Sequence, residues 1–195
     1  MWWMDLGIKA GLGAAKIASL WNKKIKQALD GRRNLPEKIA TVIHPGDKVI
    51  WFHAASFGEF EEGRPLLEEI HQHYPQYKIL VTFFSPSGYN AHKNYPHADL
   101  VCYLPADITR DVRSFLDVVH PEIAIFIKYE FWPNLLSEMK KRLIRTFVVS
   151  ARFIPNSRFF KWYGGVFRKA LSAFETIFVQ DKRSSRLYDE LLNKL

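Results

Sequence analysis

The chain has 195 residues, of which 48% are hydrophobic and 15% aromatic, and this composition excludes disordered, collagen-like and low-complexity sequence. Its one cysteine, Cys102, excludes an internal disulfide framework and any zinc site built from several cysteines. The formal net charge is +8, and two segments carry it: residues 1–33 have a net charge of +5, and residues 140–169 hold nine Lys or Arg and no acid. Such cationic segments favour an anionic partner, namely a membrane surface, a phosphorylated substrate or nucleic acid.

Residues 1–33 predict one amphipathic helix that associates with a membrane. Asp5, Lys9, Lys16 and Lys23 share one stripe of a helical wheel, because seven residues make nearly two turns, and apolar side chains spread over the other side. These charges argue against a spanning helix, and no cleavable signal peptide is visible. Tryptophans at both ends and lysines on the polar stripe are typical of a helix that lies in the membrane plane. The residues assigned to this contact are Trp2, Trp3, Lys9, Lys16, Trp21, Lys23 and Lys24. A helix packed on its own domain or on a partner is the alternative.

Residues 34–195 show short apolar runs that alternate with helical patterns. The runs lie at 48–54, 78–84, 100–104, 123–127, 144–150 and 176–179. The helical patterns lie at about 59–73, 86–94, 109–118, 131–142, 157–172 and 182–194. Buried strands that alternate with helices predict βα units. We therefore expect an α/β fold, a Rossmann-like three-layer domain with a parallel sheet.

Ligands of such sheets bind beyond the carboxyl ends of the strands, so the loops that follow the predicted strands should meet at one rim. Glu59 follows a small-residue turn there and opens a helix. Ser56 and Glu59 fit a capping box, in which the carboxylate accepts the Ser56 amide. Beside Gly58, which lets a substrate approach, the same carboxylate could act as a general base. The residues alone leave both roles open.

Other side chains at the strand ends can also have either a functional or a structural role. Glu130 is a second acidic candidate, or a helix-start acid stabilised by the helix dipole, and Trp132 beside it could form a wall for a sugar or an acyl chain. The loop with Ser85, Ser87 and Gly88 could cradle a phosphate, or it is an ordinary helix cap with proline at the first position. Arg152 could bind a phosphate or carboxylate, or it is a solvated charge.

Several classes of site are not expected. The glycine-rich dinucleotide fingerprint and the Walker A sequence are both absent. His71 and His73 point to different sides of a helix, so we do not expect them to form a metal pair, and no cofactor is expected. The basic residues are segregated without a stacking motif, so we expect no nucleic-acid partner, and a lipid-binding or interaction module without catalysis is the stronger alternative to an enzyme.

The strand-end loops, in this order, resemble 3-deoxy-D-manno-octulosonic acid (Kdo) transferase, the lipopolysaccharide enzyme of Gram-negative bacteria. The similar segments are HAASFGE at 53–59, TFFSPSG at 82–88, YLPAD at 103–107, EFWPN at 130–134, SAR at 150–152 and QD at 180–181. These segments lie in register at matching βα positions within residues 48–181. The basic amphipathic N-terminus also looks like the membrane-associating start of this family.

The resemblance implies that residues 34–195 form the acceptor-binding, N-terminal half of a GT-B glycosyltransferase, and that the C-terminal donor-binding domain is absent from this chain. Such enzymes transfer Kdo from CMP-Kdo to lipid A precursor, with inversion and without a metal, at the cytoplasmic face of the inner membrane. CMP-Kdo is then bound mainly by the absent domain, and this chain alone should be inactive.

The resemblance also assigns roles to individual residues. Glu59 stands at the family's general-base position and Glu130 at a second acidic position. The residues expected to bind the acceptor or its phosphates are Ser56, Gly58, Ser85, Ser87, Gly88, Trp132 and Arg152. Many members carry another acid and a threonine before the second glutamate, where this chain has Lys128 and Tyr129.

Overall fold

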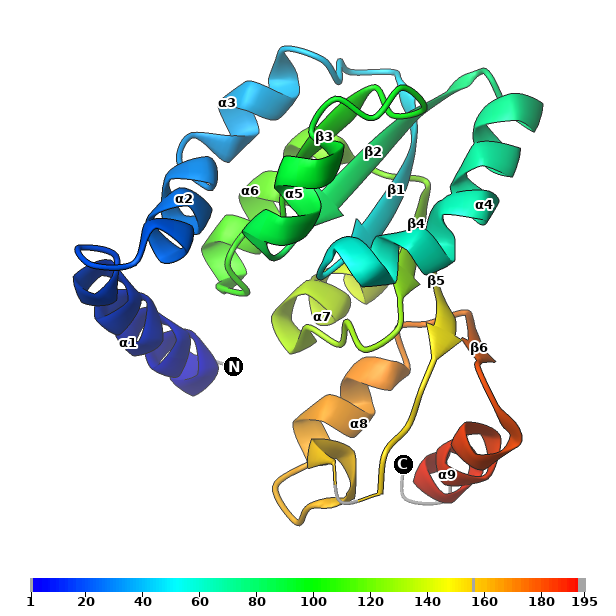
Figure 1. Ribbon diagram of the computed structural model, residues 1–195. Helices are drawn as coiled ribbons and strands as arrows, with labels where there is room; N and C mark the ends of the chain where they lie inside the picture. Colours follow the sequence, from blue (N-terminus) through cyan, green and yellow to red (C-terminus); the bar gives the residue numbers. More distant parts are fainter. Residues whose placement is uncertain (1, 156, 193–195) are drawn as a thin grey trace.

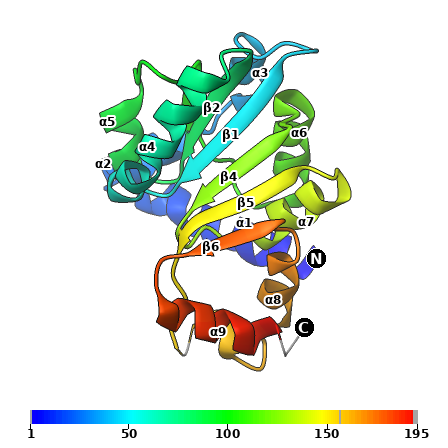
Figure 2. The same cartoon turned by 90° about the vertical axis from the view of Figure 1, so that its right-hand side faces the viewer.

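The computed structural model describes residues 2–155 and 157–192, and its centre is one sheet of six parallel strands (Figures 1 and 2). The strands are β1 (Lys48–Ala54), β2 (Tyr77–Phe83), β3 (Leu100–Tyr103), β4 (Ile123–Ile127), β5 (Arg145–Ala151) and β6 (Thr176–Val179). Their order is β3-β2-β1-β4-β5-β6, so the direction of winding reverses between β1 and β4. The predicted α/β fold is confirmed, and no strand boundary differs from the predicted one by more than one residue.

Helices cover both faces of the sheet, as the crossover connections between parallel strands require. α4 (Phe57–His73) and α5 (Pro86–His92) pack on one face. The other face carries α3 (Leu35–Ala40), α6 (Thr109–Val119), α7 (Pro133–Lys141) and α8 (Gly165–Leu171), and α9 (Lys182–Leu192) follows β6. β1 is buried along nearly its whole length because both of its faces are covered, which explains its unbroken apolar run.

The single helix predicted over residues 157–172 is wrong. A short 3₁₀ turn (Arg158–Phe160) comes first, and α8 begins only at Gly165. Gly164 lies in the tight turn between them, where a Cβ atom would come within 2.3 Å of the Arg158 carbonyl oxygen. The chain reverses there because glycine alone leaves room for the crowded carbonyls.

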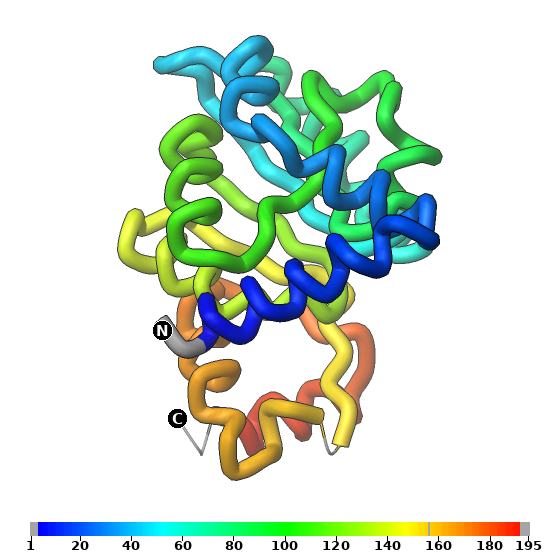
Figure 3. The backbone as a smooth tube through the Cα atoms, turned by 90° about the vertical axis from the view of Figure 1, so that its left-hand side faces the viewer, coloured from blue at the N-terminus to red at the C-terminus, as the bar shows by residue number. Residues whose placement is uncertain are grey.

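The N-terminal segment also differs from the prediction, because residues 1–33 hold two helices. α1 (Trp2–Ala18) and α2 (Lys23–Gly31) are separated by a turn, and Asn22 caps α2 by accepting the amides of Lys24 and Ile25. Lys23 and Lys24 therefore belong to α2 and do not continue the α1 stripe. Figure 3 shows this pair in blue, lying across the outside of the domain.

Asp5 attaches α1 to the domain, although the wheel places it beside the lysines. Its Oδ1 accepts the backbone N–H and the hydroxyl of Thr109, each at 3.2 Å, and the side-chain amide of Asn134 at 2.9 Å. Thr109 begins α6, whose first amides have no partner within the helix. Asp5 thus acts as a cap supplied by another helix.

The side of α1 adjacent to Asp5 is exposed and apolar. Leu6 and Ile17 are each 63% exposed, and Leu20 and Trp21 in the following turn are more so. The predicted contacts of Trp2 and Trp3 concern side chains outside those that the structure describes. Within the described part of the chain, none of the helices combines the length and the hydropathy that crossing a bilayer requires.

We expect Asp5→Ala to loosen α1 and to lower the free energy of unfolding by about 1 kcal/mol, the usual effect of losing a helix cap. Urea denaturation and the rate of proteolysis within α1 measure the two effects. Asp30→Ala is the matched control, because the ion pair that the described residues give Asp30 is with the exposed Arg33. Equal losses for both variants would show that Asp5 does not hold the helix.

Candidate functional site

The loops after β1, β2, β4 and β5 are joined to one another at the carboxyl edge of the sheet. The Ser85 amide donates to the Ala55 carbonyl at 2.9 Å, which ties the loop after β2 to the loop after β1. The Lys128 amide donates to the Val149 carbonyl at 2.9 Å, which ties the end of β4 to β5. These two bonds join the loops in pairs along the edge where the rim was predicted.

Beneath this rim lies a buried chain of hydrogen bonds that crosses β2, β1 and the loop after β4. Trp51 Nε1 donates to the hydroxyl of Thr82 at 2.8 Å, and that hydroxyl lies 2.8 Å from His53 Nδ1. His53 Nε2 lies 2.8 Å from Oε2 of Glu130, and Trp132 Nε1 donates to the same oxygen at 2.7 Å. Glu130 is only 7% exposed, so these contacts replace its lost water.

The direction of the first of these bonds follows from its donor. An indole nitrogen can only donate, so the Thr82 hydroxyl accepts from Trp51. His53 Nδ1 lies 2.8 Å from that hydroxyl and 3.0 Å from the Thr82 carbonyl oxygen, which can only accept. Oε2 of Glu130 thus lies within hydrogen-bond distance of two ring nitrogens, those of His53 and Trp132.

Glu59 lies above this chain, at the first turn of α4. The Ala55 N–H donates to its Oε2 at 2.7 Å. Burial raises the pKa of Glu59 above its ordinary value and the negative charge of Glu130 raises it further, while the Ala55 amide and the charges of His53 and Lys128 act against them. A raised pKa brings a carboxylate closer to the neutral range in which general bases are most effective.

The predicted capping box forms only in part. Ser56 is the residue before α4, but its side chain makes no capping hydrogen bond. The Glu59 carboxylate does turn back over the helix start, yet it accepts the amide of Ala55 and not that of Ser56. Among the described residues only Oε2 of this carboxylate has a hydrogen-bond donor, so its other oxygen can accept from another group.

The phosphate-loop residues have different environments. The hydroxyls of Ser85 and Ser87 lie 2.7 Å apart, and neither caps α5. Gly88 is buried, and a Cβ atom there would meet the ring of Phe83 at 2.2 Å, so packing of α5 on β2 explains this glycine. Gly58 faces open space on the rim, as a close approach of ligand requires.

Trp132 and Arg152 occupy different parts of the rim. The ring of Trp132 lies 5.0 Å from that of Phe84, which links the loops after β2 and β4. Arg152 is exposed and lines a small cavity of about 90 Å³ together with Tyr129 and Phe153. No described contact joins Arg152 to either carboxylate.

Lys128 directly follows β4 and lies two residues before Glu130. It has a positive φ of 65°, and its ammonium group pairs with Glu62 of α4. Its positive charge also lowers the pKa of Glu59, although less than the Ala55 amide does.

His53, Thr82 and Trp51 were not predicted as parts of the site. Each lies inside an apolar strand. From the sequence alone, a polar side chain in such a strand is interpreted as an isolated core residue and not as part of a site. Trp51 and His53 are two positions apart, so they point to the same face of β1, and His53 pairs with Thr82 in the register of β1 and β2. The described residues contain no group of three or more His, Cys, Asp or Glu suited to hold a metal ion.

Comparisons with known proteins give consistent matches. A family model described as 3-deoxy-D-manno-octulosonic-acid transferase (kdotransferase) matches residues 27–194. A protein of that name from Haemophilus influenzae is 30% identical over 151 residues, which cover 75% of this chain and 35% of the relative. The same name applies to a Rickettsia bellii protein, 30% identical over 82% of this chain and 39% of its own length, and to a Rickettsia felis protein, 32% identical over 73% and 31%. The matched regions thus span well under half of these relatives.

We expect Thr82→Val to lower the free energy of unfolding by about 1–3 kcal/mol, because it removes the hydroxyl between Trp51 and His53 and leaves their buried ring nitrogens with fewer partners. Thermal or urea denaturation measures the loss. Thr146→Val is the matched control: Thr146 is equally buried, but its hydroxyl makes one bond, to the Ile144 carbonyl. A loss no larger than that of the control would contradict the linked chain.

Proposed function

The chain belongs to the 3-deoxy-D-manno-octulosonic-acid (Kdo) transferase family, and we propose that it is the acceptor-binding half of an inverting glycosyltransferase of lipopolysaccharide biosynthesis. The complete enzyme transfers Kdo from CMP-Kdo to lipid A precursor. CMP-Kdo is bound mainly by a part of the enzyme outside these 195 residues, in the second domain of a GT-B fold. The observation that carries this proposal is the half-buried Glu59, held beside the buried Glu130 at the carboxyl edge of the sheet.

In this mechanism Glu59 is the general base. Its carboxylate takes the proton of the acceptor hydroxyl while the hydroxyl oxygen attacks the anomeric carbon of Kdo. The bond from that carbon to the CMP phosphate oxygen breaks, and CMP leaves with the electron pair. Attack from the face opposite the leaving group inverts the configuration, so the base and CMP must stand on opposite sides of the sugar.

Glu130 acts on Glu59 through its charge and lies below it. Hydrogen bonds with His53 and Trp132 fix the Glu130 carboxylate, so its negative charge cannot swing away from Glu59. That charge and the partial burial together raise the pKa of Glu59 and favour its role as a proton acceptor. Positioning of the acceptor supplies much of the remaining rate enhancement, because CMP is already a good leaving group.

The exposed side of α1 supports a peripheral position on an anionic membrane. Asp5 holds one side of α1 against the domain, while Leu6 and Ile17 on the adjacent side of the helix are exposed. Lys9 and Lys16 flank this apolar side, where each basic residue near an anionic surface contributes about 1 kcal/mol. A lipid acceptor can then reach the rim from the cytoplasmic face of the inner membrane of a Gram-negative cell.

Glu59→Gln in the complete enzyme should reduce Kdo transfer by at least about 100-fold, because the amide cannot accept the proton. The amide oxygen of glutamine can still accept the Ala55 N–H, so folding should be preserved. Transfer of Kdo from CMP-Kdo to lipid A precursor is the assay, with the melting temperature measured alongside.

The matched control for this variant is Glu69→Gln, which changes an exposed carboxylate on the same helix. Near-normal transfer by Glu59→Gln would show that Glu59 only caps α4. It would favour the hypothesis that the chain is a binding module without catalysis. Robust turnover of CMP-Kdo by the 195-residue chain alone would contradict the proposed division between the two domains.

Leu6→Asn should weaken binding to anionic vesicles by about tenfold, because a leucine that leaves water for the acyl region contributes about 1.5–3 kcal/mol. Co-sedimentation with liposomes measures the partition. Leu66→Asn on α4 is the matched control, since Leu66 is also an exposed leucine but lies away from α1. Equal binding by both variants would contradict the proposed contact between α1 and the membrane.

A further inference from the structure

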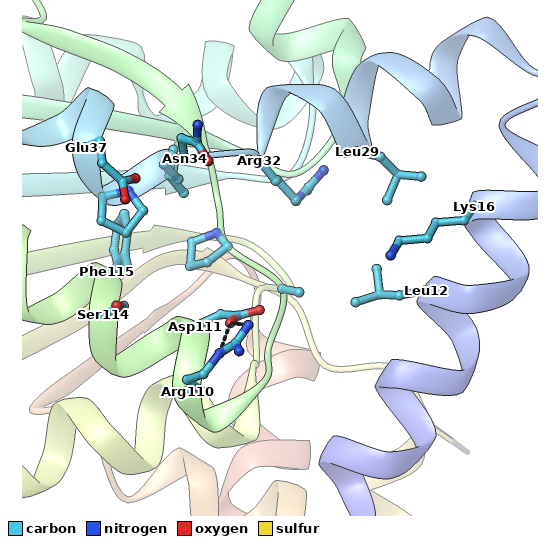
Figure 4. Close-up of a pocket in the computed structure, with 14 residues that line it drawn as sticks. Leu12, Lys16, Leu29, Arg32, Asn34, Glu37, Arg110, Asp111, Ser114 and Phe115 are labelled. Atoms are coloured by element: carbon cyan, nitrogen blue, oxygen red, sulfur yellow. Dashed lines mark hydrogen bonds and ion pairs between the residues drawn. The ribbon is translucent and has the colours of Figure 1, made fainter.

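A cavity of about 400 Å³ lies between the N-terminal helices and α6, and it contains neither Glu59 nor Glu130 (Figure 4). Residues from α1, α2, α3, α6 and the loop after β3 form its wall. The volume lies within the range of small-molecule sites. What the cavity can bind depends on the charges and the apolar groups in this wall.

Arg32 is the most unusual residue of the wall, because its partly buried guanidinium meets no described carboxylate. Its guanidinium donates to three main-chain carbonyls, those of Leu104, Ala28 and Phe84, at 2.7–2.8 Å. The rings of Phe84 and Tyr103 lie about 5 Å from its central carbon. Burial lowers its pKa to about 10, which still leaves it charged at neutral pH.

The hydrogen bonds of Arg32 leave part of its donor capacity unused. A guanidinium carries five N–H groups, and each of its two terminal nitrogens has a second hydrogen beyond the one already bonded here. Neutral carbonyls do not cancel its positive charge. An anion in the cavity would therefore find both a charge and free donors at Arg32.

Lys16 of α1 adds a second cation to the same wall, and it has no described ion pair. Figure 4 shows Lys16 and Arg32 at the same end of the cavity, with Glu37 at the other end. Arg110 is already paired with Asp111 at 3.0 Å. The end of the cavity near Lys16 and Arg32 is therefore its cationic end.

Apolar side chains stand beside these cations. Leu12 and Leu29 lie near Lys16 and Arg32, and Phe115 lies farther along the wall (Figure 4). A free inorganic ion would leave these groups without a partner, whereas a ligand with an apolar tail would cover them. We propose that this cavity binds a phosphate ester with an apolar tail, the chemistry of an anionic lipid, with the phosphate at Lys16 and Arg32 and the tail along Leu12 and Leu29.

This site is separate from the transfer reaction and does not rest on it. α1 presents its exposed apolar side to the surroundings and its other side to the cavity, so a lipid bound there would touch the helix from within the domain. The site would then bind the charged headgroup of a membrane lipid, while the exposed apolar side chains of α1 contact the acyl region of the membrane.

Isothermal titration calorimetry with short-chain dihexanoyl phosphatidic acid, kept below its micelle concentration, tests the proposal on the 195-residue chain. We expect saturable binding of one molecule. Dihexanoyl phosphatidylcholine, which has no net charge, and inorganic phosphate, which has no tail, should each bind at least about tenfold more weakly. Equal binding of the uncharged lipid, or of phosphate alone, would overturn the proposed ligand chemistry.

Lys16→Glu should weaken phosphatidic acid binding by at least about tenfold, because it places a negative charge at the cationic end. Lys9→Glu is the matched control: it makes the same charge change two turns earlier on α1, at a residue that does not line the cavity. Both lysines are exposed, so neither variant should change the melting temperature. Equal weakening by both variants, or no saturable binding by the wild-type chain, would contradict the site.

Discussion

The burial of one carboxylate, that of Glu130, constrains the centre of this structure. A charged group that loses its water must be given hydrogen-bond partners, and those of Glu130 are His53 and Trp132. His53 is held in turn by Thr82, and Thr82 by Trp51. The chain of bonds therefore requires β2, β1 and β4 to pair in this register, since a slip by one residue would move each side chain to the other face.

The fixed charge of Glu130 gives the two carboxylates different properties. Glu130 is buried and its Oε2 faces the ring nitrogens of both His53 and Trp132, whereas Glu59 is half-buried and its Oε2 accepts the Ala55 amide. Two titratable groups in contrasting surroundings are a common basis for dividing chemical roles in an active site. In the proposed mechanism Glu59 is the proton acceptor, and the charge of Glu130 raises its pKa while Lys128 and the Ala55 amide limit the effect.

Much of the fold follows from local patterns in the sequence. Buried parallel strands read as continuous apolar runs, so each strand could be placed, and motif positions at the strand ends located Glu59 and Glu130. His53 could not be assigned in this way, because its partners lie 29 and 77 residues away and only the sheet register brings them together. The break between α1 and α2 and the turn at Gly164 depend on a cap and on a carbonyl contact that helical periodicity does not encode. Asp5 was misplaced for the same reason, since its role is set by α6.

The measurement that tests this account most directly is the titration of the Glu59 carboxyl by carbon-13 NMR, in the wild-type chain and in Glu130→Gln. In the wild type we expect the pKa of Glu59 to lie above that of an ordinary glutamate, because burial and the Glu130 charge both disfavour its ionised form. In Glu130→Gln it should fall, because the repulsion is removed while the burial remains. A wild-type pKa at or below the ordinary value, or no change on removing the Glu130 charge, would contradict the proposed coupling of the two carboxylates.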